Sequence, residues 1–187
     1  MAEFGSLAGA LAAGPGAQAR ALGDARPLED GGAVVRYLGA VRQAMVHALR
    51  TEALAGPRLA DSQSLINYLF LDMAHLPTER LRVLFLNSAN RLLYDETVAE
   101  GSVNETPIYP REIMRRALEI GATALILVHN HPSGDPRPSA GDIDATKRVI
   151  QAAKALDIGV HDHVIVARSG WTSFRALGLL QGGVSGK

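Results

Sequence analysis

The stretch from Gly121 to Asp142 constrains the fold more than any other part of the chain. After Gly121 it carries an apolar run, TALILV, that is typical of a buried strand, and then continues as HNHPSGDPRPSAGD. Pro132 has no amide hydrogen and ends the strand, while the Gly and Pro residues after it favour a chain reversal. Apolar residues then recur at helical spacing from Ile143 to Leu156. The sequence therefore predicts a strand, a turn and a helix in succession.

This strand–turn–helix segment also carries the residues of a metal site. In an extended backbone, His129 and His131 point to one side and Asn130 to the other. Asp142 lies in the first turn of the helix, where the reversal can return it to the two imidazoles. Two histidines and one carboxylate leave a fourth position for water, which is typical of a catalytic zinc site. Ser139 and Asp142 also form a plain helix-capping pattern, and the cap and the metal site are compatible.

The spacing of these residues resembles a known signature. His129-x-His131, seven residues, Ser139, two residues and Asp142 resembles the motif of the JAMM (MPN+) zinc metalloproteases. The surrounding sequence resembles the bacterial RadC-like branch of that family from about residue 65 to residue 180. The segments that carry this likeness are YPRE from Tyr109, HNHPSGD from His129, Pro138-Ser139 and DHVIV from Asp162.

The resemblance implies a chemistry for each of these positions. It implies a Zn²⁺ ion held by His129, His131 and Asp142, with Ser139 as a hydroxyl that stabilises an oxyanion. Zinc lowers the pKa of a bound water toward ~7 and polarises a carbonyl. The resemblance also implies an upstream glutamate as general base, which takes the proton of the water and passes it to the leaving amine.

We assign the general base to Glu79. It directly precedes a predicted strand, after a predicted helix, which is the matching place in the family. The other interpretation is that Glu79 is a solvated loop residue beside Arg80. The rival glutamates are Glu96, Glu100, Glu105 and Glu112, of which Glu112 has the pattern of a residue in the first turn of a helix.

Composition limits the class of protein. The 187 residues fit one domain with extensions, and an apolar content of 47% is ample for a core. Lys+Arg equals Asp+Glu at 19 each, which argues against a surface that coats nucleic acid. The chain has no cysteine, no apolar run of the ~20 residues that cross a bilayer, and no early basic residues of a signal peptide. We therefore expect a cytoplasmic protein without a membrane partner.

Four segments follow along the chain. Residues 1–32 are predicted to be a flexible Ala/Gly-rich leader, 33–60 a helical extension with a helix of about four turns from Val34 to Arg50, 61–180 the metal domain, and 181–187 a tail. Within the metal domain we expect helices at 62–74, 111–120 and 140–156, and strands at 80–86, 91–98, 101–106, 122–129 and 160–167, with 171–177 returning over the sheet. This predicts an α/β (α+β) fold, a mixed sheet flanked by helices, in agreement with the fold that the JAMM resemblance implies.

A second His-x-His lies at His161 and His163. In a regular strand the two side chains would share a face. We expect Asp162 or His163 to orient the strand beside the metal or to contact a metal ligand, and the pair also allows a second metal site.

Two functions remain open at this point. The first is a zinc-dependent hydrolase that cuts a peptide or isopeptide bond in an unknown protein or peptide substrate. The second is a RadC-type accessory module of DNA repair or recombination, in which the metal site is structural or has no assigned use. The helical extension would then be a degenerate remnant of a helix-hairpin-helix region. The four arginines between Arg36 and Arg58 could contact phosphates, or could form the solvated side of an amphipathic helix. The apolar stripe of that helix could pack on the domain or on a second copy in an oligomer.

Overall fold

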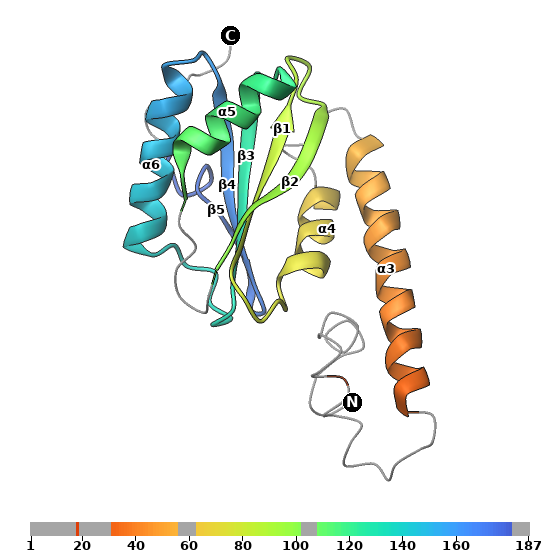
Figure 1. The fold of residues 1–187 in the computed structure, drawn as a ribbon. Coiled ribbons are helices and arrows are strands. Elements are labelled where there is room, and N and C mark those ends of the chain that lie inside the picture. Colours follow the sequence, from red (N-terminus) through yellow and green to blue (C-terminus); the bar gives the residue numbers. More distant parts are fainter. Residues whose placement is uncertain (1–17, 19–30, 56–62, 102–107, 181–187) are drawn as a thin grey trace.

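A five-stranded mixed sheet forms the centre of the protein. The computed structural model describes residues 18, 31–55, 63–101 and 108–180. The strand order is β2-β1-β3-β4-β5 (Figure 1). The strands are β1 (Arg80–Leu86), β2 (Leu92–Glu100), β3 (Ala124–His131), β4 (Gly159–Ala167) and β5 (Gly170–Ser173). The predicted fold class is therefore confirmed.

Helices cover both faces of this sheet, as Figure 1 shows. One face packs against α5 (Pro110–Ile120) and α6 (Ala140–Lys154). The other face packs against α4 (Gln63–Met73), which α3 (Gly31–Ala55) contacts in turn. Since β3 is central and both of its faces are covered, it has a continuous apolar run instead of an alternating one.

The last residues of the central strand β3 lie at the end of the sheet where β3 and the parallel strand β4 have their carboxyl ends. Leu125 and Leu127 face the core with α5 and α6, whereas Ile126 and Val128 face the core with α4. The strand then continues through the two histidines to His131. α6 connects β3 to the parallel strand β4, so that its N-terminus starts near the carboxyl end of β3. This β-α-β connection places the turn and the helix start beside the histidines.

Local sequence signals explain where α5 begins and ends. Pro110 occupies the first turn, where its missing amide hydrogen is not needed. Gly121 ends the helix in the left-handed conformation, with a φ of 72°. Its amide and that of Ala122 bond to the carbonyls of Leu118 and Ala117, which satisfies the last turn. The predicted helix at 111–120 is confirmed.

The structure corrects three expectations. The helix predicted from Val34 to Arg50 is α3, which has 25 residues, because the good helix formers after Arg50 extend it to Ala55. Residues 171–177 do not simply return over the sheet: the segment from Gly170 to Ser173 is β5, an edge strand too short to show periodicity. The predicted strand at 101–106 except its first residue, most of the segment 1–32, and the segment 181–187 lie outside the described residues.

The third correction concerns His161 and His163. A register shift in β4 places Val160 opposite Leu125 and Asp162 opposite Ile126, so His161 is the additional residue of a bulge. The two histidines therefore do not act together. The Nε2 atom of His161 lies 2.6 Å from Oδ1 of Asn90 in the turn after β1, whereas His163 contacts a residue of the candidate site.

Candidate metal centre

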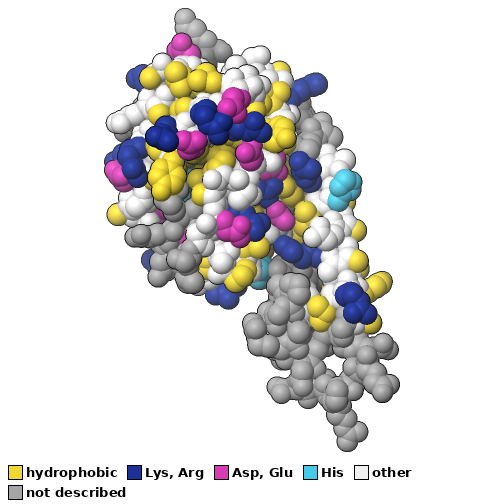
Figure 2. All heavy atoms as spheres, in the orientation of Figure 1, with side chains coloured by type: hydrophobic (Ala, Val, Ile, Leu, Met, Phe, Trp, Pro, Cys, Tyr) yellow, Lys and Arg dark blue, Asp and Glu magenta, His cyan; other side chains and the backbone are white. Residues whose placement is uncertain are grey.

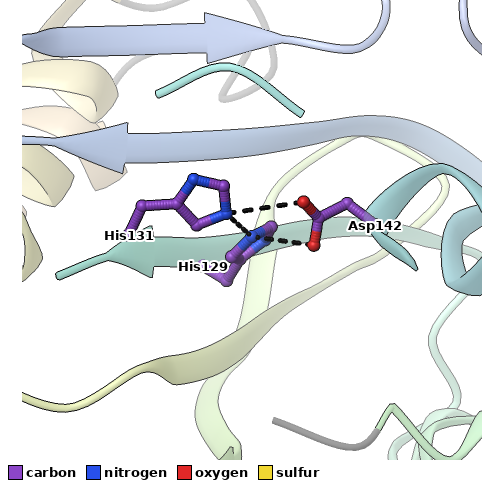
Figure 3. A group of neighbouring side chains, drawn as sticks. All are labelled: His129, His131 and Asp142. Atoms are coloured by element: carbon purple, nitrogen blue, oxygen red, sulfur yellow. Dashed lines mark hydrogen bonds and ion pairs between the residues drawn. The ribbon is translucent and has the colours of Figure 1, made fainter. Parts of the chain in front are cut away.

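The structure brings together the three predicted metal ligands. His129, His131 and Asp142 each offer one ligand atom, and these atoms all lie within 4.8 Å of one another (Figure 3). The two histidine Nε2 atoms are 2.8 Å apart. The Nε2 atoms of His129 and His131 lie 3.2 and 3.4 Å from Oδ1 and Oδ2 of Asp142, respectively. Among the described residues this is the only group with the composition and spacing to hold a metal ion.

The N-terminal cap of α6 fixes the position of Asp142. The Ser139 hydroxyl accepts a hydrogen bond from the amide of Asp142, and the carboxylate of Asp142 accepts one from the amide of Ser139 at 2.7 Å. This reciprocal pair is a capping box. It leaves Oδ1 of Asp142 directed at His129, so the cap and the candidate metal site coexist, as the sequence predicts.

A backbone carbonyl fixes the proton position on His131. Its Nδ1 lies 2.8 Å from the carbonyl oxygen of Asp135, in the turn before α6. A carbonyl only accepts hydrogen bonds, so Nδ1 of His131 carries the hydrogen. In the neutral ring the lone pair is then on Nε2, which faces the other two ligands.

A longer chain of hydrogen bonds fixes His129. The Thr146 hydroxyl donates to the carbonyl of Asp142 and therefore accepts from Nδ1 of His163, at 2.6 Å. The other nitrogen of neutral His163, Nε2, is then an acceptor for Nδ1 of His129, at 2.7 Å. His129 consequently presents its Nε2 lone pair to the cluster. The direction of one helix hydrogen bond thus determines the tautomer of a candidate ligand two side chains away.

This chain of hydrogen bonds requires a neutral His163, and the surroundings of His163 favour the neutral form. His163 is fully buried and stacks on Phe174, with ring centroids 4.5 Å apart. Burial and the adjacent His129 hold the pKa of His163 well below its usual value. His163 contacts the candidate ligand His129, as the sequence predicts. Asp162 instead faces away, and accepts hydrogen bonds from the hydroxyl of Ser173 and the amide of Arg175.

The remaining ionisable groups of the cluster attract one another. Burial lowers the pKa of His131, but its contacts with Asp142 and Asp135 and the charge of Glu79 outweigh this and raise it. Burial raises the pKa of Asp142, but the two histidines and Ser139 outweigh this and hold it far below its usual range. The cluster therefore favours an anionic carboxylate and stabilises positive charge between the three side chains.

These features fit a tetrahedral metal ion. Ligands at about 2.0–2.2 Å from Zn²⁺ lie about 3.3–3.6 Å from each other. The two histidine-to-carboxylate distances, 3.2 and 3.4 Å, end at the two different oxygens of Asp142. With one ligand atom per residue, the three atoms lie within 4.8 Å of one another, and the two Nε2 atoms would separate by about half an ångström. Two lone pairs that face each other at 2.8 Å also repel unless a proton or a cation lies between them. With three protein ligands, the arrangement could hold a metal ion and leave a fourth position for water.

Glu79 lies at the edge of this cluster. It immediately precedes β1, and its charge contributes to the raised pKa of His131. β1 runs antiparallel to β3, with Leu81 opposite His129. The same register carried two residues further sets Glu79 opposite His131. Glu79 is therefore near the candidate ligands, and its assignment as general base remains a prediction.

The rival glutamates that the structure describes are occupied elsewhere. Glu96 pairs with Arg116 at 2.6 Å, and Glu100 pairs with Arg80 at 3.0 Å. Glu112 pairs with Arg111 and Arg115 on the exposed side of α5. Glu105 lies outside the described residues.

Ser139 is close to the cluster but its hydrogen is engaged. Its hydroxyl donates to Oδ2 of Asp142 at 2.6 Å while it caps α6. To donate to an oxyanion, the hydroxyl would have to rotate away from that carboxylate. Its role in catalysis remains a prediction, and its role as the N-cap is observed.

Two arginines of α3 contact the rest of the protein, which neither sequence-based alternative predicts. Arg42 donates to the carbonyl of Asp72 at the end of α4, and Arg50 lies 3.8 Å from the carboxylate of Asp95. These two side chains therefore attach α3 to the domain. Ala53 of the same helix is fully buried in the core beneath α4. Figure 2 shows that basic and acidic side chains are interspersed on the visible face of the molecule.

Sequence reasoning did not identify two residues that organise the site. Thr146 is part of the helical pattern after Asp142, and only its position four residues later indicates that it can bond back to that carbonyl. The alternation of side chains along the strand predicts only that Asn130 points away from the two histidines. Its buried amide contacts the segment that contains Glu79, and no local sequence signal indicates this long-range contact.

One further expectation concerns membranes. Within the described part of the chain, no helix combines the length and the apolar character that a membrane span requires.

The chain is similar to known proteins over most of its length. Residues 59–179 match the family model of the RadC-like JAB domain. The chain is also similar to a UPF0758 protein of Rhodobacter capsulatus, with 46% identity over 177 residues, which cover 95% of this chain and 80% of that relative. The matched segment contains the three candidate ligands together with Glu79 and Ser139.

Proposed function

Because the chain belongs to the family of RadC-like JAB domains, a branch of the JAMM/MPN proteins, we propose that it is a zinc-dependent hydrolase that cuts a peptide or isopeptide bond. The observation that carries the proposal is the convergence of three ligand atoms from His129, His131 and Asp142, with Glu79 beside them. A structural zinc site is usually closed by four protein ligands, whereas this group offers three.

Two histidines and one carboxylate would hold the metal. The same donor set also suits Fe²⁺ or Mn²⁺, and we propose Zn²⁺ because nitrogen ligands in a tetrahedral arrangement favour it. When bound, Zn²⁺ would supply a water of lowered pKa and polarise the carbonyl of the substrate.

The protein's own groups would do the rest. His163 and the Asp135 carbonyl keep the hydrogens of His129 and His131 on Nδ1, so that both rings would bind a metal through Nε2. Glu79 would accept a proton from the attacking water and transfer it to the leaving amine. Ser139 would donate to the developing oxyanion after its hydroxyl turns from Asp142.

The test compares Glu79, which immediately precedes β1, with Glu100 at the end of the neighbouring strand β2. Glu79→Gln should abolish cleavage of a complex peptide mixture and of lysine-linked isopeptides while the protein still binds one zinc. Glu100→Gln is the matched control, because Glu100 pairs with Arg80 and lies outside the cluster. New amino termini would be counted by mass spectrometry. Cleavage by Glu79→Gln at the wild-type rate would contradict the assignment of the base.

The alternative of a DNA-repair accessory module has less support. Within the described ranges, Arg42 and Arg50 both have partners in the protein, so they do not form a free basic surface. DNA binding would require an affinity that falls steeply with salt.

A further inference from the structure

Asn130 occupies an unusual position between the two histidine ligands. It alternates with them along β3, so its side chain leaves the opposite side of the strand, and it is fully buried. A buried amide requires hydrogen-bond partners. Those of Asn130 are not in its own strand or in a neighbouring helix.

Both partners belong to the backbone that flanks Glu79. Oδ1 of Asn130 accepts a hydrogen bond from the amide of Arg80 at 2.9 Å. Nδ2 of Asn130 donates to the carbonyl of Thr78 at 3.0 Å. These contacts span 50 and 52 residues of sequence, and they bracket a single residue. The side-chain amide therefore acts as an additional peptide group, which extends the pairing of β3 with β1 beyond Leu81.

Glu79 is also held from the side of β2. Its own carbonyl accepts a hydrogen bond from the amide of Gly101 at 3.0 Å. With Thr78, Glu79 and Arg80 all fixed through backbone groups, the direction of the Glu79 side chain follows from the strand. Leu81, two residues later, faces the core with α5 and α6, as do Leu125 and Leu127 before the histidines. Glu79 thus leaves the strand on the face that carries His129 and His131.

We propose that Asn130 is a positioning residue: its amide fixes the backbone on both sides of Glu79 and so aligns the general base with the three candidate metal ligands. This inference rests on the proposed function. One strand then supplies two ligands on one face and the support of the base on the other. The distance between base and ligands is set by the rigid pairing of β1 with β3, and not by a loop.

Two substitutions separate this role from metal binding. Asn130→Asp keeps the shape and the acceptor for Arg80 but puts an oxygen against the carbonyl of Thr78. Asn130→Ser is too short to make either bond and carries no charge, so it remains informative if the Asp variant does not fold. Both leave His129, His131 and Asp142 unchanged. A displacement of the base by about 1 Å should reduce turnover about 100-fold.

Asn87→Ala is the matched control. Oδ1 of Asn87 also accepts two backbone amides, those of Ala89 and Arg91, each at 3.0 Å, at the other end of β1. Its loss removes a comparable side-chain-to-backbone pair without any contact to the site. Thermal unfolding of all variants would show how much stability each loses with its side-chain-to-backbone hydrogen bonds.

The experiment measures three quantities for the wild type, Glu79→Gln and the Asn130 and Asn87 variants. These are the zinc affinity by chelator competition, the cleavage rate, and the visible absorption spectrum after loading with Co²⁺, which reports the surroundings of the metal. We expect the Asn130 variants to keep zinc affinity within about threefold, to lose turnover, and to show the Glu79→Gln spectrum instead of the wild-type one. Asn87→Ala should match the wild type in all three.

The outcomes distinguish this inference from the proposed function. Wild-type turnover and spectrum in both Asn130 variants, with an altered Glu79→Gln, would overturn the role of Asn130 and leave the hydrolase intact. Loss of zinc together with turnover would also overturn it, because Asn130 would then support the ligands. Absence of cleavage by the wild type, with matching Asn130 and Glu79→Gln spectra, would refute the hydrolase and support the positioning. A Glu79→Gln variant equal to the wild type would refute both.

Discussion

Thr146 offers the sharpest test of how the protein prepares His129 for a metal. Thr146→Val keeps the shape of the side chain and replaces the hydroxyl with a methyl group. Thr146 is buried, and its hydroxyl connects Nδ1 of His163 to the carbonyl of Asp142. The substitution leaves that nitrogen of His163 without its acceptor, while α6 loses no backbone hydrogen bond.

The magnitude follows from the two responses that His163 has. It can keep its hydrogen on Nδ1, buried and unpaired, at a cost of about 1–3 kcal/mol. It can instead move the hydrogen to Nε2, which then donates to Nδ1 of His129 and forces the hydrogen of His129 onto the metal-facing nitrogen. The second response puts a hydrogen on Nε2 of His129, the atom that would bind zinc. Zinc binding would therefore force the hydrogen of His163 back onto Nδ1, where it is buried and unpaired. Since about 1.4 kcal/mol corresponds to a factor of ten, we expect zinc affinity to fall about 10- to 100-fold.

The assay is competition for Zn²⁺ with a chromogenic chelator at pH 7.5. The control is Thr51→Val, because the hydroxyl of Thr51 also donates to the carbonyl four residues earlier, at 2.9 Å, but on an exposed helix surface without a histidine. Thr51→Val should bind zinc as the wild type does. Wild-type affinity in Thr146→Val would refute the argument that the hydrogen-bond chain sets the tautomer of His129.

Two other predictions address protonation and stability. Zn²⁺ and a proton compete for Nε2 of His131, whose pKa is raised above 6.5. Zinc affinity should therefore be constant above that raised pKa and fall about tenfold per pH unit below it. An affinity that stays constant down to pH 5 would contradict this. Arg82→Ala should lower the free energy of unfolding, measured by urea denaturation, by about 3–5 kcal/mol. The reason is that Asp95, whose side chain is 2% exposed, loses its main buried cation. As a control, Arg137→Ala removes an exposed pair with Asp135 and should leave the urea midpoint nearly unchanged.

Much of the fold could be predicted because its signals are local. Periodicity and caps place α5, α6, β1 and β3 within a few residues, since Pro110, Gly121 and Ser139 each act on the backbone next to them. The strand–turn–helix with two histidines and Asp142 was predicted for the same reason. The bulge at His161 was not, because a register shift depends on the neighbouring strand and leaves no local pattern.

The parts of the site that were missed depend on contacts between distant residues. The partners of Asn130 are 50 and 52 residues away, and His163 reaches Thr146 across the β4–α6 packing. Their residue types are ordinary in a strand and in a helix. Only the arrangement of β1, β3, β4 and α6 gives these side chains a role toward the ligands.

The central claim is that His129, His131 and Asp142 hold one Zn²⁺ ion. The most direct test is the metal content of the purified protein by elemental mass spectrometry, for the wild type, for His129→Ala with His131→Ala, and for His47→Ala as a control on α3 outside the cluster. We predict about one zinc per chain in the wild type and in His47→Ala, and none in the double variant. A wild-type protein that contains no metal after incubation with Zn²⁺, or a double variant that retains it, would contradict the assignment of the site.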